Sequence, residues 1–316
     1  WYGGHVDNSP SSNMLSLWLA LAAVDSEFEP LHVPRAFGEP ASDVKIADFG
    51  DNFEFGLATA PAHVEDQLDD AWLAFAEEGR VAAWRDVPLA RERTRFWTSP
   101  EEDIALAAGT GVKVFRMGVD WGRLVGTPEA SEGQELVEGL LLRPVWEQYE
   151  LILWLVVKHE MKVMLTLFHH SLPTWLAESG GWLNAATVVA FGNFATAVSR
   201  AIAATPVLSG ALHSVIPFNE PHVFALLTYC ARMWPPAREA PPAHEQLTCF
   251  SPWGGYGMAM TAMAQAHGRA YTAVRAAGLK APVGVAHHVP AYSALTLIDR
   301  PAQVCEMEER RNVMSQ

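Results

Sequence analysis

The sequence predicts an α/β fold in which βα units surround a parallel sheet. From Asp51 onward, short β-branched or aromatic runs alternate with longer helical stretches, which is the pattern of such units. Most of the short runs are apolar nearly throughout, as strands covered on both faces should be. Half of the 316 residues are hydrophobic, so the chain can bury a sizeable core.

The strands and helices follow from this alternation. Five segments are expected to form strands: Phe53–Thr59, Val112–Gly118, Lys162–Phe168, His213–Phe218 and Pro282–His287. Four segments are expected to form helices: Glu101–Ala108, Pro144–Glu160, Ala186–Ala204 and Gly257–Ala277. The first helix is preceded by Ser99 and Pro100, a capping residue and a proline that favour a helix start. Two stretches rich in Gly, Pro and Glu are predicted to be long loops: Gly126–Gly139 and Pro235–Gly255.

Three regions are expected along the chain. Residues 1–50 form an N-terminal extension, residues 51–291 carry the βα pattern, and residues 292–316 form a divergent polar tail. The chain starts with Trp1 rather than methionine, so we expect the true N-terminus to lie elsewhere. The apolar run Met14–Val24 is well under the roughly 20 residues needed to span a bilayer. We interpret it as a short helix or the remnant of a longer segment rather than a membrane anchor.

Charge and cysteine content exclude several classes of partner. A net charge of -14 argues against nucleic acid, because phosphate binding needs a cationic surface. The three cysteines, Cys230, Cys249 and Cys305, are an odd set without a CxxC pair. This pattern predicts neither a disulfide framework nor a thiolate metal site, and it fits a reducing or neutral compartment.

No cofactor or metal is expected. The pairs His169-His170 and His287-His288 place adjacent side chains on opposite faces of a strand, so one site cannot easily use both members of a pair. Gly109-Thr110-Gly111 lies before a strand instead of after one, so it does not predict dinucleotide binding.

The segment VIPFNEP, Val215–Pro221, is the most informative for chemistry. It places Asn219 and Glu220 directly after an apolar strand. A carboxylate there can donate a proton to a leaving oxygen if its surroundings raise its pKa, and the amide can hold a substrate hydroxyl. The alternative is a capped turn that has no catalytic role.

Further segments resemble glycoside hydrolase family 1, the β-glucosidase-like family. FEFGLATAPAHVED at 53–66 is similar to the family pattern FxFGxATSAYQxEG, and GVKVFRMGVDWGRL at 111–124 is similar to YRFSISWSRI. KVMLTLFHHSLPTWL at 162–176 resembles VTLYHWDLPxxL, and GGWLN at 180–184 followed by FNEP completes a collinear series from about Asp51 to His288. The resemblance implies an incomplete (β/α)8 TIM barrel with about five of its eight βα units, and glycosidase or glycosyltransferase chemistry.

One subgroup of this family has motifs that are more similar to those of this sequence. GLATAPAHVED followed by LDDAWLAFAEE, and FHHSLP in place of YHWDLP, resemble the plant Sensitive-to-Freezing galactolipid galactosyltransferases of the chloroplast outer envelope. This resemblance implies galactosyl transfer between monogalactosyldiacylglycerols, a sugar or galactolipid substrate, and peripheral membrane contact at that envelope. The alternatives are a soluble intracellular β-glucosidase-type hydrolase and a non-catalytic half-barrel that binds or assembles with a partner.

The resemblance also assigns roles to individual residues. Glu220 is implied to be the acid/base, and Arg116 the cation that orients the nucleophilic glutamate and keeps it ionised. Asn219, His169 and His63 are implied to bind the sugar, although most of the family has a glutamine at the position of His63.

Structural alternatives stay open for several of these residues. His169 and His170 could be core or rim histidines, and Arg116 could pair with Asp120. Some tryptophans could either stack on sugar rings or fill the core: Trp97, Trp121, Trp175 and Trp182.

The nucleophile is missing from the sequence. A retaining glycosidase needs a second carboxylate, which the family carries in an ITENG-like motif, and no such motif follows FNEP here. The later glutamates fall in a proline-rich loop or in the tail: Glu239, Glu245, Glu306, Glu308 and Glu309. We therefore expect this chain alone to be inactive.

Overall fold

A computed structural model describes residues 50, 52–81, 91–126, 136–137, 140–236 and 248–288, with only the backbone at 136–137. The chain divides into two compact units, residues 1–53 and 54–316, and the described helices and strands all belong to the second. The N-terminal extension, the run Met14–Val24 and the tail at 292–316 lie outside the described residues, as do most of the two predicted loops.

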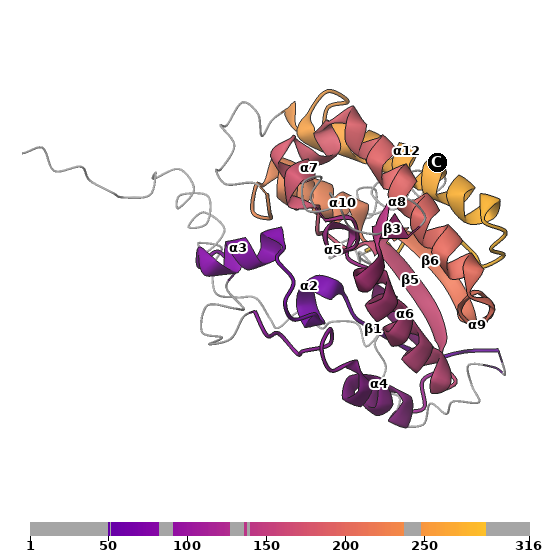
Figure 1. Cartoon of the computed structure of the whole chain (residues 1–316). Helices are drawn as coiled ribbons and strands as arrows, with labels where there is room; N and C mark the ends of the chain where they lie inside the picture. The colour runs from indigo at the N-terminus through magenta and orange to yellow at the C-terminus, as the bar shows by residue number, and fades with distance from the viewer. Residues whose placement is uncertain are drawn as a thin grey trace, which may run out of the picture. The chain divides into compact units, whose positions relative to one another are not determined.

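A parallel sheet of four strands forms the centre of this unit (Figure 1). Its strands stand in the order β1 (Gly56–Ala58), β2 (Val114–Gly118), β5 (Lys162–Phe168) and β6 (Leu212–Phe218), and all neighbouring pairs are parallel. Two short strands, β3 (Leu136–Val137) and β4 (Leu141–Leu142), pair separately in an antiparallel ribbon. The predicted α/β fold with a parallel sheet is confirmed.

The fifth predicted strand is only partly correct. Pro282–His287 lies beside β6 but forms two isolated parallel bridges, Val215 with Val283 and Asn219 with Ala286, rather than a continuous ladder. The amide of Gly284 donates to Val215 O, and the amide of Ala286 donates to Phe218 O. Two residues on this segment thus match three on β6, and the register slip interrupts the ladder.

The four predicted helices are present within two residues of their expected bounds: α4 (Pro100–Gly109), α6 (Arg143–Lys158), α8 (Ala185–Ala204) and α12 (Gly255–Ala276). In α6 the buried side chains Trp146, Tyr149, Leu153 and Val156 recur every three or four residues and face the core. By length and composition α8 could cross a membrane, but more than half of it is buried in the fold. It packs against α12 (Figure 1).

Shorter helical segments follow the strands or connect the longer helices. They are α2 (Pro61–Val64), α3 (Ala71–Glu77), α5 (Trp121–Val125), α7 (Thr174–Glu178), the 3-10 turn η3 (Gly181–Leu183), α9 (Pro206–Ala211), α10 (Pro221–Ala225) and the π-turn η4 (Leu226–Cys230). Several of them begin directly after a strand, so they fix the direction in which the residues at the strand ends point.

An aromatic core supports the ends of β5 and β6. Phe168 and Phe218, the last residues of these strands, both contact Trp182, with ring centroids 5.4 and 5.3 Å apart. Trp121 and Phe191 continue the cluster at 5.3 Å. Each fully buried aromatic side chain contributes on the order of 2–3 kcal/mol. Trp121 and Trp182 therefore belong to the core and do not stack on a ligand.

The expectation of no disulfide is wrong. Cys230 at the end of η4 bonds to Cys249, with the two Cα atoms 5.6 Å apart. The bond joins positions 19 residues apart, so it depends on how the chain folds back and not on a local motif. Cys305 lies outside the described residues.

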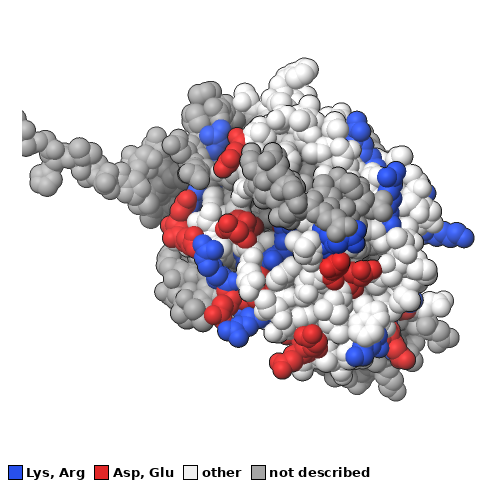
Figure 2. Space-filling model, viewed as in Figure 1, with Lys and Arg blue, Asp and Glu red and all other residues white. Residues whose placement is uncertain are grey.

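The surface carries charges of both signs. On the face shown in Figure 2, acidic and basic side chains are interspersed. Some of these charges form ion pairs. Two such pairs are Arg91–Glu77 and Lys162–Glu54, each with a nitrogen-to-oxygen distance of 2.7 Å.

Candidate active site

Polar residues gather where β2, β5 and β6 end. Arg116 lies on β2, His169 and His170 follow β5, and Asn219 and Glu220 follow β6. Because neighbouring parallel strands end at the same edge of a sheet, these groups come together there. Barrel enzymes hold their catalytic groups at this edge.

Arg116 links the three strands. Its Nη2 donates to Asn219 Oδ1 at 2.6 Å, and its Nε donates to Thr166 Oγ1 at 3.0 Å. Burial lowers the pKa of Arg116, and the negative charge of Glu220 acts in the opposite direction. The predicted alternative partner, Asp120, instead accepts from the amide of Arg123 at 2.7 Å. Arg116 therefore belongs to the Asn219–Glu220 cluster.

The backbone fixes Glu220 in an unusual conformation. Its φ of 41° and ψ of 56° lie in the left-handed region. This conformation is energetically unfavourable for any residue other than glycine. Its amide donates to Ala286 O at 2.7 Å, and its carbonyl accepts from the amide of Phe224 at 3.0 Å. These bonds hold the strained residue between the strand end and α10, with its side chain half-buried.

His170, for which a core or rim position stayed open, contacts Asn219 and Phe224. Its Nε2 lies 3.0 Å from Asn219 O, a distance at which an Nε2–H donates to the carbonyl. The ring also stacks on Phe224, with centroids 5.8 Å apart. His170 is buried, and burial lowers its pKa to about 4. It is therefore neutral at pH 7 and acts as a support for Asn219.

His169 and His63 lie close to each other. Their ring centroids are 6.1 Å apart, and the buried Nδ1 of His169 has no hydrogen-bond partner among the described residues. Burial is the main cause that lowers the pKa of both rings, and nearby Arg116 contributes at His169. Two neutral imidazoles can donate to and accept from hydroxyl groups.

Sequence reasoning missed two tryptophans at the site. Trp72 Nε1 donates to the carbonyl of His170 at 3.0 Å, and the Trp234 ring lies 4.8 Å from the His170 ring. The two indoles contact each other at 5.2 Å. Trp72 lies in the segment LDDAWLAFAEE, but the resemblance assigns it no role, and no family motif in the sequence includes Trp234.

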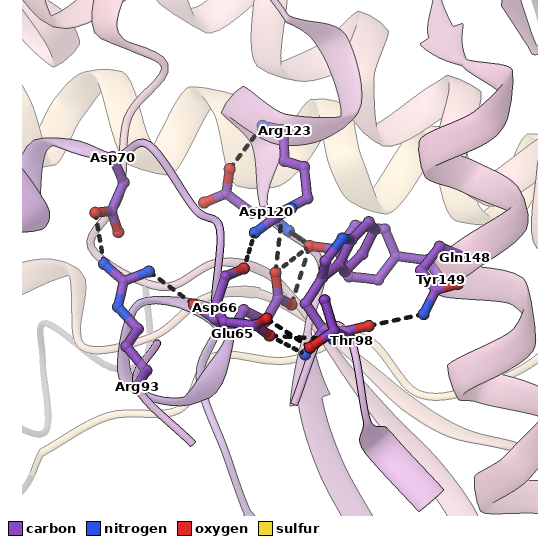
Figure 3. Close-up of polar contacts among 10 residues, drawn as sticks. Glu65, Asp66, Asp70, Arg93, Thr98, Asp120, Arg123, Gln148 and Tyr149 are labelled. Atoms are coloured by element: carbon purple, nitrogen blue, oxygen red, sulfur yellow. Dashed lines mark hydrogen bonds and ion pairs between the residues drawn. The ribbon is translucent and has the colours of Figure 1, made fainter. Parts of the chain in front are cut away.

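A buried polar network holds the connections after β1 and β2 (Figure 3). The Tyr149 hydroxyl lies 3.0 and 2.9 Å from the two carboxyl oxygens of Glu65 and accepts from the amide of Asp120 at 2.9 Å. Arg123 Nε lies 3.3 Å from Glu65 Oε2. Burial raises the pKa of Glu65 to about 8 and that of Asp120 to about 6, and Arg123 opposes both shifts. The network anchors the segment that carries His63.

The fold and the polar groups at the strand ends define a class: a partial βα barrel that holds a carboxylate, an amide and a guanidinium where barrel enzymes hold their catalytic groups. A family model for glycosyl hydrolase family 1 matches residues 46–313. The chain belongs to glycosyl hydrolase family 1.

Three relatives show different degrees of sequence identity to this chain. "Beta-glucosidase-like SFR2, chloroplastic" of Oryza sativa subsp. japonica is 36% identical over 345 residues, covering 84% of this chain and 51% of the relative. "Galactolipid galactosyltransferase SFR2, chloroplastic" of Arabidopsis thaliana is 38% identical over 312 residues, covering 80% and 48%. "Thermostable beta-glucosidase B" of Thermobispora bispora is 30% identical over 184 residues, covering 57% and 35%. The chain spans about half the length of the first two relatives.

Solved structures share the fold. A rice beta-glucosidase, Os3BGlu6, superposes with a TM-score of 0.66 at 22% identity, covering 82% of this chain and 53% of that one. The AHE enzyme from Alicyclobacillus herbarius gives 0.60 at 22% identity, covering 80% and 52%. The predicted incomplete (β/α)8 barrel is thereby confirmed.

Proposed function

We propose that this chain carries the acid/base half of a retaining glycosyl-transfer site, and that its substrate is a galactolipid. The main support for the proposal is the contact between Arg116 and Asn219, which lies next to Glu220 at the strand ends. The similarity to a protein named galactolipid galactosyltransferase supports the choice of substrate. The reaction is the transfer of a galactosyl group from one monogalactosyldiacylglycerol to another.

Each residue then has a defined task. Glu220 protonates the leaving oxygen in the first step and deprotonates the acceptor hydroxyl in the second. Asn219 presents its Nδ2, which lies 3.3 Å from His170 Nε2, to a sugar hydroxyl, since Arg116 already occupies its Oδ1. The neutral imidazoles of His63 and His169 bind further hydroxyls.

Turnover requires a second carboxylate about 5–5.5 Å from Glu220. The sequence of 316 residues contains no ITENG-like motif after FNEP. We propose that the nucleophile comes from polypeptide outside these residues, that Arg116 orients it, and that the chain alone is inactive.

The two relatives whose names include SFR2 are both called chloroplastic. We propose a chloroplast location for this chain as well, with peripheral contact at the outer envelope, where a galactolipid substrate is present in the bilayer.

Two other functions remain candidates. Similarity to a bacterial beta-glucosidase favours hydrolysis with water as the acceptor. The missing second carboxylate favours a non-catalytic half-barrel that binds or assembles with a partner.

A chimera separates the three candidates. This chain is fused to the remaining C-terminal part of the Arabidopsis thaliana relative and assayed on monogalactosyldiacylglycerol in vesicles and on an aryl β-glycoside. Digalactosyl lipid as the product supports the transferase. Release of free sugar only supports the hydrolase, and a folded chimera without either product supports the non-catalytic protein.

A further inference from the structure

A cavity lies among the connections that follow β1, β2 and β5. Its volume is about 330 Å³, within the range of small-molecule sites. Its polar and aromatic lining residues are Gln67, Asp69, Asp70, Asp120, Arg123, Ser171, Thr174 and Trp175. None of the residues proposed to bind the sugar beside Glu220 lines this cavity.

Asp70 is a buried carboxylate with one unused oxygen. Its Oδ1 accepts from the amide of Leu73 at 2.9 Å and from Arg93 at 2.8 Å, and this oxygen caps α3. Its Oδ2 has no hydrogen-bond partner among the described residues, although the residue is only 5% exposed. A buried carboxylate oxygen in this state favours any ligand that brings a hydrogen-bond donor.

Ser171 points to the same kind of ligand. It is 7% exposed, it lines the cavity, and the described residues offer its hydroxyl no hydrogen bond. It stands where the family pattern YHWDLP has an aspartate, because this chain reads FHHSLP. The smaller side chain leaves room beside Gly122 and Pro173, which also line the cavity.

The remaining walls favour a ligand that brings hydrogen-bond donors, such as the hydroxyl groups of a sugar. Asp69, Asp70 and Asp120 supply acceptors, and Arg123, which also lines the cavity, already donates to Asp66 O and lies 3.3 Å from Glu65 Oε2. A ligand must therefore supply donors. Trp175 Nε1 already donates to Gly126 O at 2.9 Å, which leaves the ring for the C–H face of a sugar. Among the described residues no group of three or more His, Cys, Asp or Glu is arranged to hold a metal ion.

We propose that this cavity is a second carbohydrate subsite that binds a neutral hexosyl ring through Asp70, Ser171 and the face of Trp175. The proposal does not depend on the catalytic role of Glu220. Ser171 directly follows His170, and Trp72, two residues after Asp70, donates to the His170 carbonyl. Ser171 and Trp72 therefore connect this subsite to His170, the residue that supports Asn219.

The test is a titration of the full chain with methyl β-D-galactopyranoside, followed by the indole N–H signals in NMR spectra. Signals of Trp175 and Trp234 are assigned with tryptophan-to-phenylalanine variants. We expect a saturable shift of the Trp175 signal with a dissociation constant on the order of millimolar. Ser171→Ala should weaken this affinity about tenfold. Ser179→Ala, at the exposed position that follows α7, should leave it unchanged.

A second variant guards against misfolding. Asp69 is exposed and lines the cavity, so Asp69→Asn should fold normally and still weaken the Trp175 shift. A shift of Trp234 with none at Trp175 overturns the subsite but leaves the proposed site beside Glu220 intact. A Trp175 shift that Ser171→Ala and Asp69→Asn leave unchanged also overturns the subsite. A shift of Trp175 alone, weakened by these variants, supports it even if no sugar binds beside Glu220.

Discussion

Two glutamates of this chain lie in opposite environments. Glu220 is half-buried at the strand ends, where its charge acts on Arg116. Glu65 is 1% exposed, and its carboxyl group is fully engaged by Tyr149 and Arg123. A carboxyl group that is accessible and held by strained backbone can meet a substrate, whereas one satisfied on all sides can only hold the fold together.

The largest effect is expected at Glu220. In the chimera, Glu220→Gln removes the proton donor and should lower kcat about 10²–10⁴-fold, measured as digalactosyl lipid formed. Glu147→Gln, an exposed position on α6, is the matched control and should keep full activity. Equal activity of the two variants would remove Glu220 from the mechanism.

Loss of Arg123 tests the buried network. Arg123→Ala removes the contact with Glu65, the 2.8 Å bond to Asp66 O and the packing on Trp97. We expect a loss of about 2–4 kcal/mol in the free energy of unfolding, measured with urea. Arg200→Ala, an exposed position on α8, should cost little. A small loss for both would mean that the network does not hold the connections.

The disulfide should stabilise the fold by about 3 kcal/mol, because it closes a loop between positions 19 residues apart. The double variant Cys230→Ala/Cys249→Ala should unfold at correspondingly lower urea concentration. Adding a reductant should destabilise the original chain but not the variant. A reductant effect of the same size on both would trace the loss to another cause.

The free energy of unfolding should decrease as the pH rises from the ordinary pKa of a glutamate toward the raised pKa of Glu65. Burial raises its folded-state pKa to about 8, above the ordinary value of 4.5. Between these values the unfolded chain loses a proton that the folded chain keeps, so the free energy of unfolding decreases and then levels off above about pH 8. Glu65→Gln should flatten this slope in urea unfolding curves from pH 5 to 8. An unchanged slope would show that Glu65 is not its source.

The smallest effect is expected at an exposed pair. Arg91 and Glu77 are 2.7 Å apart, but their side chains are 63% and 52% exposed. Glu77→Ala should cost at most about 1 kcal/mol in the free energy of unfolding, and less in high salt. A loss in the free energy of unfolding equal to that of Arg123→Ala would contradict the expectation that buried contacts stabilise the fold more than exposed ones.

Periodic and apolar patterns predicted the main elements well. In α6 the spacing of Trp146, Tyr149 and Leu153 is local information, so the helix could be read from the chain. Pro282–His287 has a strand-like composition, but its ladder is interrupted by a register slip against β6 that only the paired chains reveal.

The motif around Asn219 and Glu220 predicted that both residues directly follow a strand, and they directly follow β6. Their catalytic and binding roles stay predictions. Sugar binding by His169 stays a prediction. The contact of His170 with Asn219 O was not predicted, because it depends on the direction in which each of two adjacent side chains points. The bond between Cys230 and Cys249 and the contact of Trp234 with His170 arise from the return of the chain after η4.

The most direct test is a crystal structure of the full chain with bound methyl β-D-galactopyranoside. We predict that the Glu220 carboxyl group lies within hydrogen-bond distance of the glycosidic oxygen, with Asn219 Nδ2 on a ring hydroxyl. The absence of a sugar beside Glu220, with the Glu220 side chain turned away from Asn219, would contradict the acid/base role of Glu220.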